Sequence, residues 1–247
     1  MNSGAEAVET AIKSSRRWAY RTKKVEPGKA EIIVAEGNFH GRTTTIISFS
    51  TDENSKEDFG PHTPGFKAVK YGCSKSIETA INENTAAVLI EPIQGEGGII
   101  VPPENYLREV REICTKNNVL MLLDEIQSGL GRTGKLFAYQ HSCGDCNCNI
   151  GCEDDQVRES RPDGLILGKA LGGGFMPVSC FLTSKEVMQW MDPGSHGSTF
   201  GGNPLAAAIA KRSLELLDEE DLIENSRLMG DYFKESLLGM NSKLIKE

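Results

Sequence analysis

Short apolar runs bounded by turn-forming residues recur along the chain. Each run is rich in leucine or β-branched residues, which is typical of strands that are buried on both faces of a sheet. The runs cover residues 30–35, 86–90, 119–123, 164–167 and 178–182. We therefore expect the chain to form a buried sheet from these segments.

Between the runs, apolar positions follow a helical spacing. The first such segment, residues 103–117, begins with a proline. Its apolar face is formed by Tyr106, Leu107, Val110, Ile113 and Cys114. A second helix is predicted over 205–217 after Asn203 and Pro204, with the acidic run 218–221 as its solvated end. Alternating strands and helices predict an α/β domain whose mostly parallel sheet is flanked by helices.

The chain opens on a helix signal with no strand before it. Ser3 and Glu6 form a capping box, and the predicted helix carries Val8, Ile12 and Trp18. Because an α/β chain rarely starts in this way, we expect the sequence to be an internal fragment of a longer polypeptide. We also expect its last residues, 244–247, to break off in mid-structure.

The composition narrows the possible partners. The 247 residues contain 27 Lys and Arg against 35 Asp and Glu, a net charge of -8, which argues against a nucleic-acid or anionic membrane surface. No apolar run approaches the length of a membrane-spanning helix. Seven cysteines and no signal peptide favour a reducing compartment. Small molecules are the expected partners.

Polar residues follow three of the predicted strands, where ligands bind in open α/β sheets. They are Glu91, Asp124 and Lys169. Lys169, beside the glycines 172–174, is either an amine nucleophile at a ligand site or an ordinary surface lysine. Asp124 either faces the ligand or caps a helix. The segment is not a phosphate-binding P-loop, because Ala170 follows the lysine.

Two further features can be explained either by a purely structural role or by ligand binding. The helix start at Gly4 and Ala5 offers backbone N–H groups for an anion, although most capping boxes bind nothing. Residues 143–152 form an insertion with four thiols that either clips a soft metal ion or is a plain surface loop. We favour the loop, because two of the thiols are one residue apart, and we assign no metal site. The other cysteines, Cys73, Cys114 and Cys180, are expected to fill the core.

Six stretches of the chain match the sequence motifs of one protein family, in the same order along the chain. They read NSGAEA at 2–7, FHGRT at 39–43, EPIQGE at 91–96, DEIQSG at 124–129, GKAL at 168–171 and GSTFGGNP at 197–204. Together they resemble the class III pyridoxal-phosphate aminotransferases of fold type I. The resemblance implies that residues 1–247 are the cofactor-binding large domain, without the N-terminal segment and the C-terminal small domain of the family.

The resemblance also implies roles for individual residues around pyridoxal phosphate. Lys169 would hold the cofactor covalently and shuttle a proton, while Asp124 would pair with the pyridine nitrogen. The other implied cofactor contacts are Phe39 stacked on the ring, Gln127 on the phenolic oxygen, Gly4 and Ala5 on the phosphate, and Ser198 and Thr199 on the phosphate of a second subunit. For the substrate, Arg42 would clamp a carboxylate, and Glu96 would pair with an arginine beyond residue 247.

Within this class, the wording around Lys169 is most like the ornithine aminotransferase branch. This implies transfer of the δ-amino group of ornithine to 2-oxoglutarate, as in proline biosynthesis and arginine catabolism, by a homodimer in the cytoplasm or the mitochondrial matrix. Gly131 and Gly173 lean towards enzymes of N-acetylornithine, so these and other ω-amino acids form the alternative. The non-enzyme alternative is an inactive fragment with a metal-binding cysteine loop.

Overall fold

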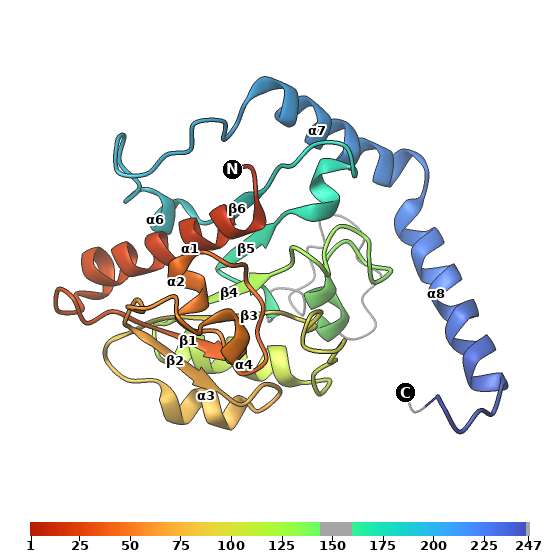
Figure 1. The fold of residues 1–247 in the computed structure, drawn as a ribbon, viewed down its shortest axis with the longest axis horizontal. Coiled ribbons are helices and arrows are strands. Elements are labelled where there is room, and N and C mark those ends of the chain that lie inside the picture. Colours follow the sequence, from red (N-terminus) through yellow and green to blue (C-terminus); the bar gives the residue numbers. More distant parts are fainter. Residues whose placement is uncertain (144–159, 246–247) are drawn as a thin grey trace.

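The computed structural model describes residues 1–143 and 160–245 and is built around one six-stranded sheet of order β2-β1-β3-β4-β5-β6 (Figure 1). The strands are β1 (Glu31–Ala35), β2 (Phe66–Val69), β3 (Thr85–Ile90), β4 (Leu120–Asp124), β5 (Gly164–Leu167) and β6 (Cys180–Thr183). All neighbouring strands are parallel except β6, which is antiparallel to β5. The predicted α/β fold with a mostly parallel sheet is confirmed.

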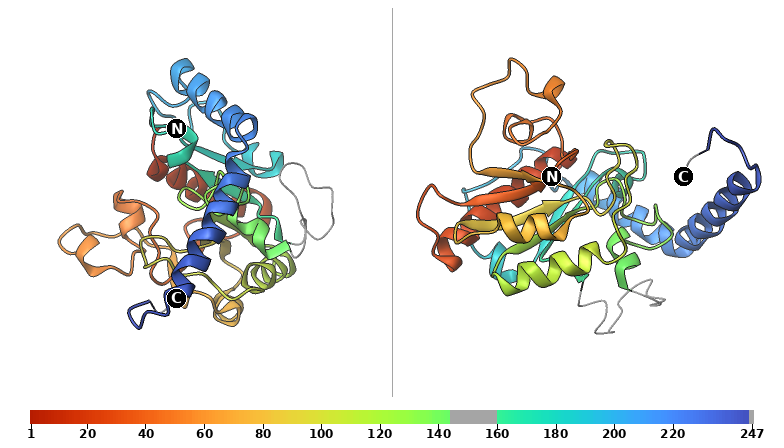
Figure 2. Two further views of the ribbon diagram at one scale, coloured as in Figure 1. Left: turned by 90° about the vertical axis from the view of Figure 1, so that its right-hand side faces the viewer. Right: turned by 90° about the horizontal axis from the view of Figure 1, so that it is seen from below.

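Helices lie on both faces of the sheet (Figure 2). The helices are α1 (Gly4–Trp18), α2 (Thr44–Ile47), α3 (Ser74–Ala80), α4 (Tyr106–Lys116), α6 (Lys185–Met188), α7 (Pro204–Glu219) and α8 (Leu222–Gly239). The chain also forms a short π-helix at Ala19–Lys23 and short 3-10 helices at Glu53–Ser55, Ala138–Cys143 and Lys169–Gly172. The capping box of Ser3 and Glu6 is present at the start of α1, as the sequence predicts.

Side chains alternate between the two faces along each strand. On β1, Ile32 and Val34 pack in the cluster that includes α1. Ile33 and Ala35 of the same strand pack in the cluster that includes α3 and α4. Because both faces are covered, the central strands are apolar between their end residues, which explains their continuous apolar runs.

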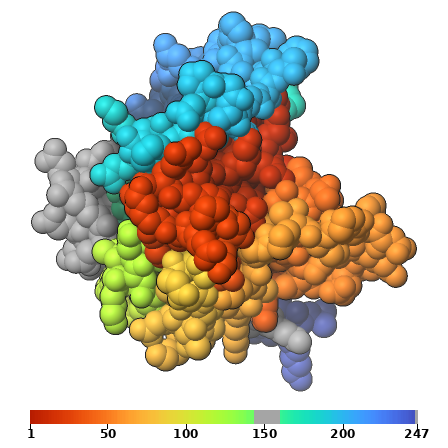
Figure 3. All heavy atoms as spheres, turned by 90° about the vertical axis from the view of Figure 1, so that its left-hand side faces the viewer, coloured from red at the N-terminus to blue at the C-terminus, as the bar shows by residue number. Residues whose placement is uncertain are grey.

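Strand β2 is absent from the sequence prediction. Its four residues are half-buried or exposed, because it lies at the edge of the sheet beside β1 alone. An edge strand of this kind leaves no continuous apolar run in the sequence. Between α2 and β2 the chain forms a projection on one side of the molecule (Figure 3).

Two predicted boundaries are wrong by a few residues. The helix predicted from residue 103 begins at Tyr106, because the Pro103 carbonyl accepts a hydrogen bond from the Tyr106 amide in a turn ahead of the helix. The strand predicted from residue 178 begins at Cys180. The amide of Ser179 instead donates to the Met1 carbonyl, which ties this segment to the start of the chain.

Helix α8 extends from the body of the molecule and packs against α7 (Figure 1). Only Ile223 of its residues is buried. Large apolar side chains on α8 are exposed: Leu222, Leu228, Met229, Tyr232, Phe233 and Leu238. Among the described residues, no helix is long and apolar enough to cross a membrane.

Candidate active site

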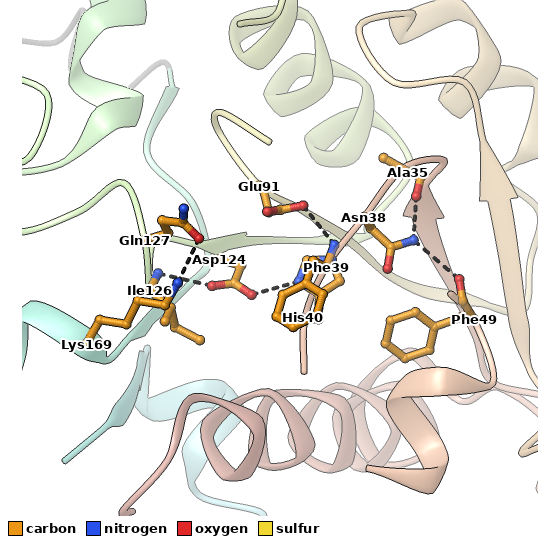
Figure 4. Close-up of polar contacts among 10 residues, drawn as sticks. All are labelled: Ala35, Asn38, Phe39, His40, Phe49, Glu91, Asp124, Ile126, Gln127 and Lys169. Atoms are coloured by element: carbon orange, nitrogen blue, oxygen red, sulfur yellow. Dashed lines mark hydrogen bonds and ion pairs between the residues drawn. The ribbon is translucent and has the colours of Figure 1, made fainter. Parts of the chain in front are cut away.

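The ends of β3, β4 and β5 meet the N-terminus of α1 around a cavity of about 200 Å³. The residues that line it are Gly4, Ala5, Phe39, His40, Gly41, Glu91, Ile93, Asp124, Ile126, Gln127 and Lys169. Glu91, Asp124 and Lys169 follow neighbouring strands, so the sheet brings together the three polar residues that the sequence singled out (Figure 4).

Lys169 lies two positions after the last residue of β5 and has a backbone φ of 40°, a left-handed conformation that is unusual for a residue with a side chain. Its amine donates a hydrogen bond to Gln127 Oε1 at 2.7 Å. Lys169 is exposed, so the amine is accessible from the cavity. Lys169 and Gln127 thus lie together at this cavity.

Asp124, at the end of β4, is 5% exposed and uses its two carboxylate oxygens differently. Oδ1 accepts a hydrogen bond from the Ile126 amide at 3.0 Å, and Oδ2 lies 2.7 Å from His40 Nδ1. The bond from the Ile126 amide lies in a turn, and no helix begins there, so Asp124 lines the cavity and caps no helix. Asp124 lines the cavity, whereas its neighbour Glu125 does not.

His40 is a site residue that the sequence reasoning missed. Its side chain is fully buried, and its Nε2 has no hydrogen-bond partner among the described residues. The contact with Asp124 joins residues 84 positions apart, so nothing local in the sequence reveals it. The one signal in the sequence was that His40 follows Phe39 in the FHGRT stretch at 39–43, where Phe39 was already a candidate site residue.

Phe39 forms a wall of the cavity and is tied to β3 through Glu91. The Phe39 amide donates to Glu91 Oε2 at 3.1 Å, and the guanidinium of Arg42 lies 5.4 Å from the centre of the Phe39 ring. Burial raises the pKa of Glu91, an effect that the nearby His40 opposes. The loop that carries Phe39 and His40 is therefore fixed to the strand end.

Two glycines allow backbone segments to approach closely around the cavity. Gly41 has φ of 124°, and a Cβ at this position would lie 2.9 Å from Ala5 Cβ. A Cβ on Gly95 would lie 2.5 Å from Gln127 Nε2. Both distances are shorter than real contacts, so larger residues would displace α1 or Gln127.

The N-terminus of α1 forms one end of the cavity. Ser3 and Glu6 satisfy the cap, which leaves the first-turn amides of Gly4 and Ala5 without intrahelical acceptors. Burial alone would raise the pKa of Glu6, but hydrogen bonds from Asn2, Ser198 and Ser3 outweigh it and lower the pKa to about 2. Free amides at a positive helix end suit a phosphate or a carboxylate.

The remaining predicted site residues lie outside the cavity lining. Ser198 Oγ donates to Glu6 Oε1 and accepts from Asn2 Nδ2, both at 2.9 Å, so it sits beside the N-terminus of its own α1. Thr199, Arg42 and Glu96 are exposed. Their roles toward a second subunit or a substrate stay predictions.

Glu125 lies beneath the site and anchors the following segment. Its carboxylate accepts hydrogen bonds from Ser128 Oγ at 2.7 Å, from the Ala138 amide at 3.0 Å and from the Tyr139 amide at 2.9 Å. Complete burial raises its pKa to about 7 against the effect of these donors. Glu125 therefore holds the chain that leaves the site, without facing the cavity.

The cysteine-rich insertion lies almost entirely outside the described residues. Within the parts of the chain that the structure describes, no group of three or more His, Cys, Asp or Glu side chains is placed to hold a metal ion. Cys114 is buried, whereas Cys73 and Cys180 are partly buried, so only Cys114 is fully in the core as expected.

Comparison with known proteins places the chain in a family. A family model described as class-III aminotransferase matches residues 1–247. The chain therefore belongs to the class-III aminotransferases, the family that its motifs resemble. Members of this family use pyridoxal phosphate as cofactor.

Individual relatives are more specific. The chain is 51% identical to an ornithine aminotransferase of Brevibacillus brevis over its whole length, and it spans 58% of that protein. A Toxoplasma gondii ornithine aminotransferase structure, with partial occupancy of the cofactor at its active site, matches 96% of this chain and 53% of its own, with 43% identity and a TM-score of 0.88. An acetylornithine aminotransferase from Elizabethkingia anophelis is 46% identical, with a TM-score of 0.79, over 97% of this chain and 55% of its own.

The donor set around the cavity fits pyridoxal phosphate. The cofactor needs an amine for its aldehyde, an acid for its pyridine nitrogen and donors for its phosphate. Lys169, Asp124 and the amides of Gly4 and Ala5 offer these groups around one cavity. Phe39 and Ile126 add apolar walls for a flat ring.

Proposed function

We propose that this chain is the cofactor-binding large domain of an ornithine aminotransferase. The reaction is transfer of the δ-amino group of ornithine to 2-oxoglutarate, which gives glutamate semialdehyde and glutamate. The observation that carries the proposal is the cavity lined by both the Lys169 amine and the Asp124 carboxylate, with a helix N-terminus at one end. Relatives that are named ornithine aminotransferase and are 51% and 52% identical to this chain support the choice of ornithine as substrate.

Pyridoxal phosphate supplies an electron sink for the carbon that loses a proton. Lys169 would hold the cofactor, and its amine, when free, would serve as the base that takes a proton from the substrate carbon. This double task requires an amine that acts as nucleophile and base. Asp124 keeps a proton on the pyridine nitrogen, because a buried carboxylate favours a neighbouring positive charge.

The surrounding residues orient the cofactor. Phe39 would stack on its ring, and Gln127, which lies beside Lys169, would contact the phenolic oxygen. Gly4 and Ala5 bind the phosphate with their amides. Ser198 and Thr199 bind the phosphate of a second subunit, which makes the active unit a homodimer.

Arg42 binds a substrate carboxylate, because its planar guanidinium can form a bidentate pair with a carboxylate. Glu96 pairs with an arginine from a part of the protein that lies outside these residues, and releases it when glutamate binds. On this proposal the remaining segments of the polypeptide complete the substrate site.

Transfer from N-acetylornithine is the second candidate. The specific observation in its favour is the 46% identity to the Elizabethkingia anophelis acetylornithine aminotransferase. The test is kcat/KM for ornithine and for N-acetylornithine, measured on the longest polypeptide that contains this chain. Ornithine should be the better substrate by at least about tenfold, or about 1.4 kcal/mol in transition-state binding. A preference for N-acetylornithine would reject the ornithine assignment.

A further inference from the structure

His196 attaches the loop between α6 and α7 to α1. Its half-buried ring lies over two residues of one face of α1, with Nε2 2.9 Å from Thr10 Oγ1 and Nδ1 2.9 Å from Lys13 Nζ. Lys13 also donates to the Ser195 carbonyl at 3.3 Å. The segment around residues 190–205 accordingly lies along α1 (Figure 3).

These contacts determine the protonation state of His196. The Lys13 ammonium has donors only, so Nδ1 must accept and carry no proton. The Thr10 hydroxyl donates to the Glu6 carbonyl at 2.7 Å, so its oxygen accepts from Nε2–H. The arrangement requires a neutral ring, because a second proton would point an N–H at an ammonium group.

The charges around His196 favour the same state. Burial lowers its pKa first, and Lys13 and the terminal amine of Met1 lower it further, whereas Glu6 and Glu9 raise it. On the loop itself, Asp192 faces Arg17 at 3.8 Å. The net result is a pKa below the ordinary value of about 6.5.

Two residues further along, the loop reaches the cofactor end of α1. Ser198 contacts Glu6 and Asn2 there, next to Gly4 and Ala5 of the cavity lining. Residues 195–199 are thus attached to α1 at His196 and at Ser198, with a further bond from Lys13 to the Ser195 carbonyl. Because His196 and Ser198 are close in sequence, loss of the His196 contacts frees the chain that leads to Ser198.

We propose that His196 is a positioning residue: its neutral ring holds residues 195–199 on α1 and keeps Ser198 at the N-terminus of that helix, and protonation of the ring releases the loop. The attachment is complete above about pH 6.5 and is lost as the pH falls through the lowered pKa. The consequence for cofactor affinity rests on the proposed phosphate role of Ser198 and Thr199. The attachment itself does not.

The test is an NMR titration of the 247-residue chain from about pH 8 to about pH 5, a range that spans the ordinary histidine pKa. The His196 ring should titrate below about 6.5, and the amide signals of Ser198 and Thr199 should shift with the same midpoint. In His196→Gln, which cannot titrate, these amide shifts should disappear. Lys13→Met should move the His196 midpoint upward, whereas the distant control Lys211→Met should leave it unchanged.

The proposal is overturned if the amide signals of Ser198 and Thr199 do not shift at the His196 midpoint, or if they still shift at that pH in His196→Gln. It is also overturned if Lys13→Met leaves the His196 midpoint unchanged. Cofactor affinity measured over the same pH range distinguishes the attachment of the loop by His196 from the proposed phosphate role of Ser198 and Thr199. If the loop signals follow His196 and the dissociation constant rises with the same midpoint, both the attachment and the phosphate role are supported. If the loop signals follow His196 while affinity stays flat, the attachment stands and the phosphate role of the loop is rejected.

Discussion

Asp124 illustrates how a single side chain is prepared for its task. One oxygen is held by a backbone amide and the other by a buried histidine, so the carboxylate has little rotational freedom. A buried carboxylate without such partners would be costly or would take up a proton. The orientation of Asp124 toward the cavity therefore depends on His40, a residue from a different part of the chain.

We predict that His40→Ala weakens binding of pyridoxal phosphate by about 10- to 100-fold, the usual cost of losing a hydrogen bond to a buried charge. The measurement is an equilibrium titration of the chain with the cofactor, followed by visible absorbance. His62→Ala, on the exposed projection, is the matched control and should bind like the parent. Unchanged affinity in a folded His40→Ala protein would refute the role of this contact.

At the scale of elements, the cavity depends on loops that approach one another closely. The loop after β3 passes so close to Gln127, in the loop after β4, that a Cβ at position 95 would lie 2.5 Å from the side-chain amide of Gln127. This approach places Gln127 against Lys169. The strand ends carry Glu91, Asp124 and Lys169, and the loops between them fix their spacing.

Replacing Gly95 by alanine tests this arrangement. The added Cβ would meet the amide end of Gln127, which is flexible, so we expect Gln127 to move and the fold to survive. The melting temperature should change little, while the visible spectrum of the bound cofactor changes and its affinity falls by about tenfold. Gly230→Ala, where an added Cβ meets nothing within 4 Å, is the control. A Gly95→Ala protein with the parental spectrum and affinity would show that the close approach has no functional consequence.

At the scale of the whole molecule, the sheet order explains why three residues predicted separately share one site. Glu91, Asp124 and Lys169 follow strands that are neighbours in the sheet, and apolar runs identify such strands well. Three features escaped prediction for physical reasons. The edge strand β2 lacks an apolar run, α8 has few buried positions to create a pattern, and the contact of His40 with Asp124 exists only after folding.

The molecule also raises the question of which subunit uses the loop of Ser198 and Thr199. We predict a homodimer in which the loop serves the neighbouring site. Inactive Lys169→Ala and inactive Ser198→Ala/Thr199→Ala proteins, prepared in the longest polypeptide that contains this chain, should regain activity when their subunits are mixed. Each mixed dimer then has one site with an intact lysine and an intact loop. Sedimentation verifies that dimers form, and mixed dimers without activity would assign the loop to its own subunit.

We propose that Lys169 is the residue that holds pyridoxal phosphate. The most direct measurement is borohydride reduction of the chain in the presence of the cofactor, followed by peptide mapping. We expect a single labelled site at Lys169, with no label in Lys169→Ala and full label in the surface control Lys211→Ala. A label on another lysine, or label that persists in Lys169→Ala, would exclude Lys169 as the residue that holds the cofactor.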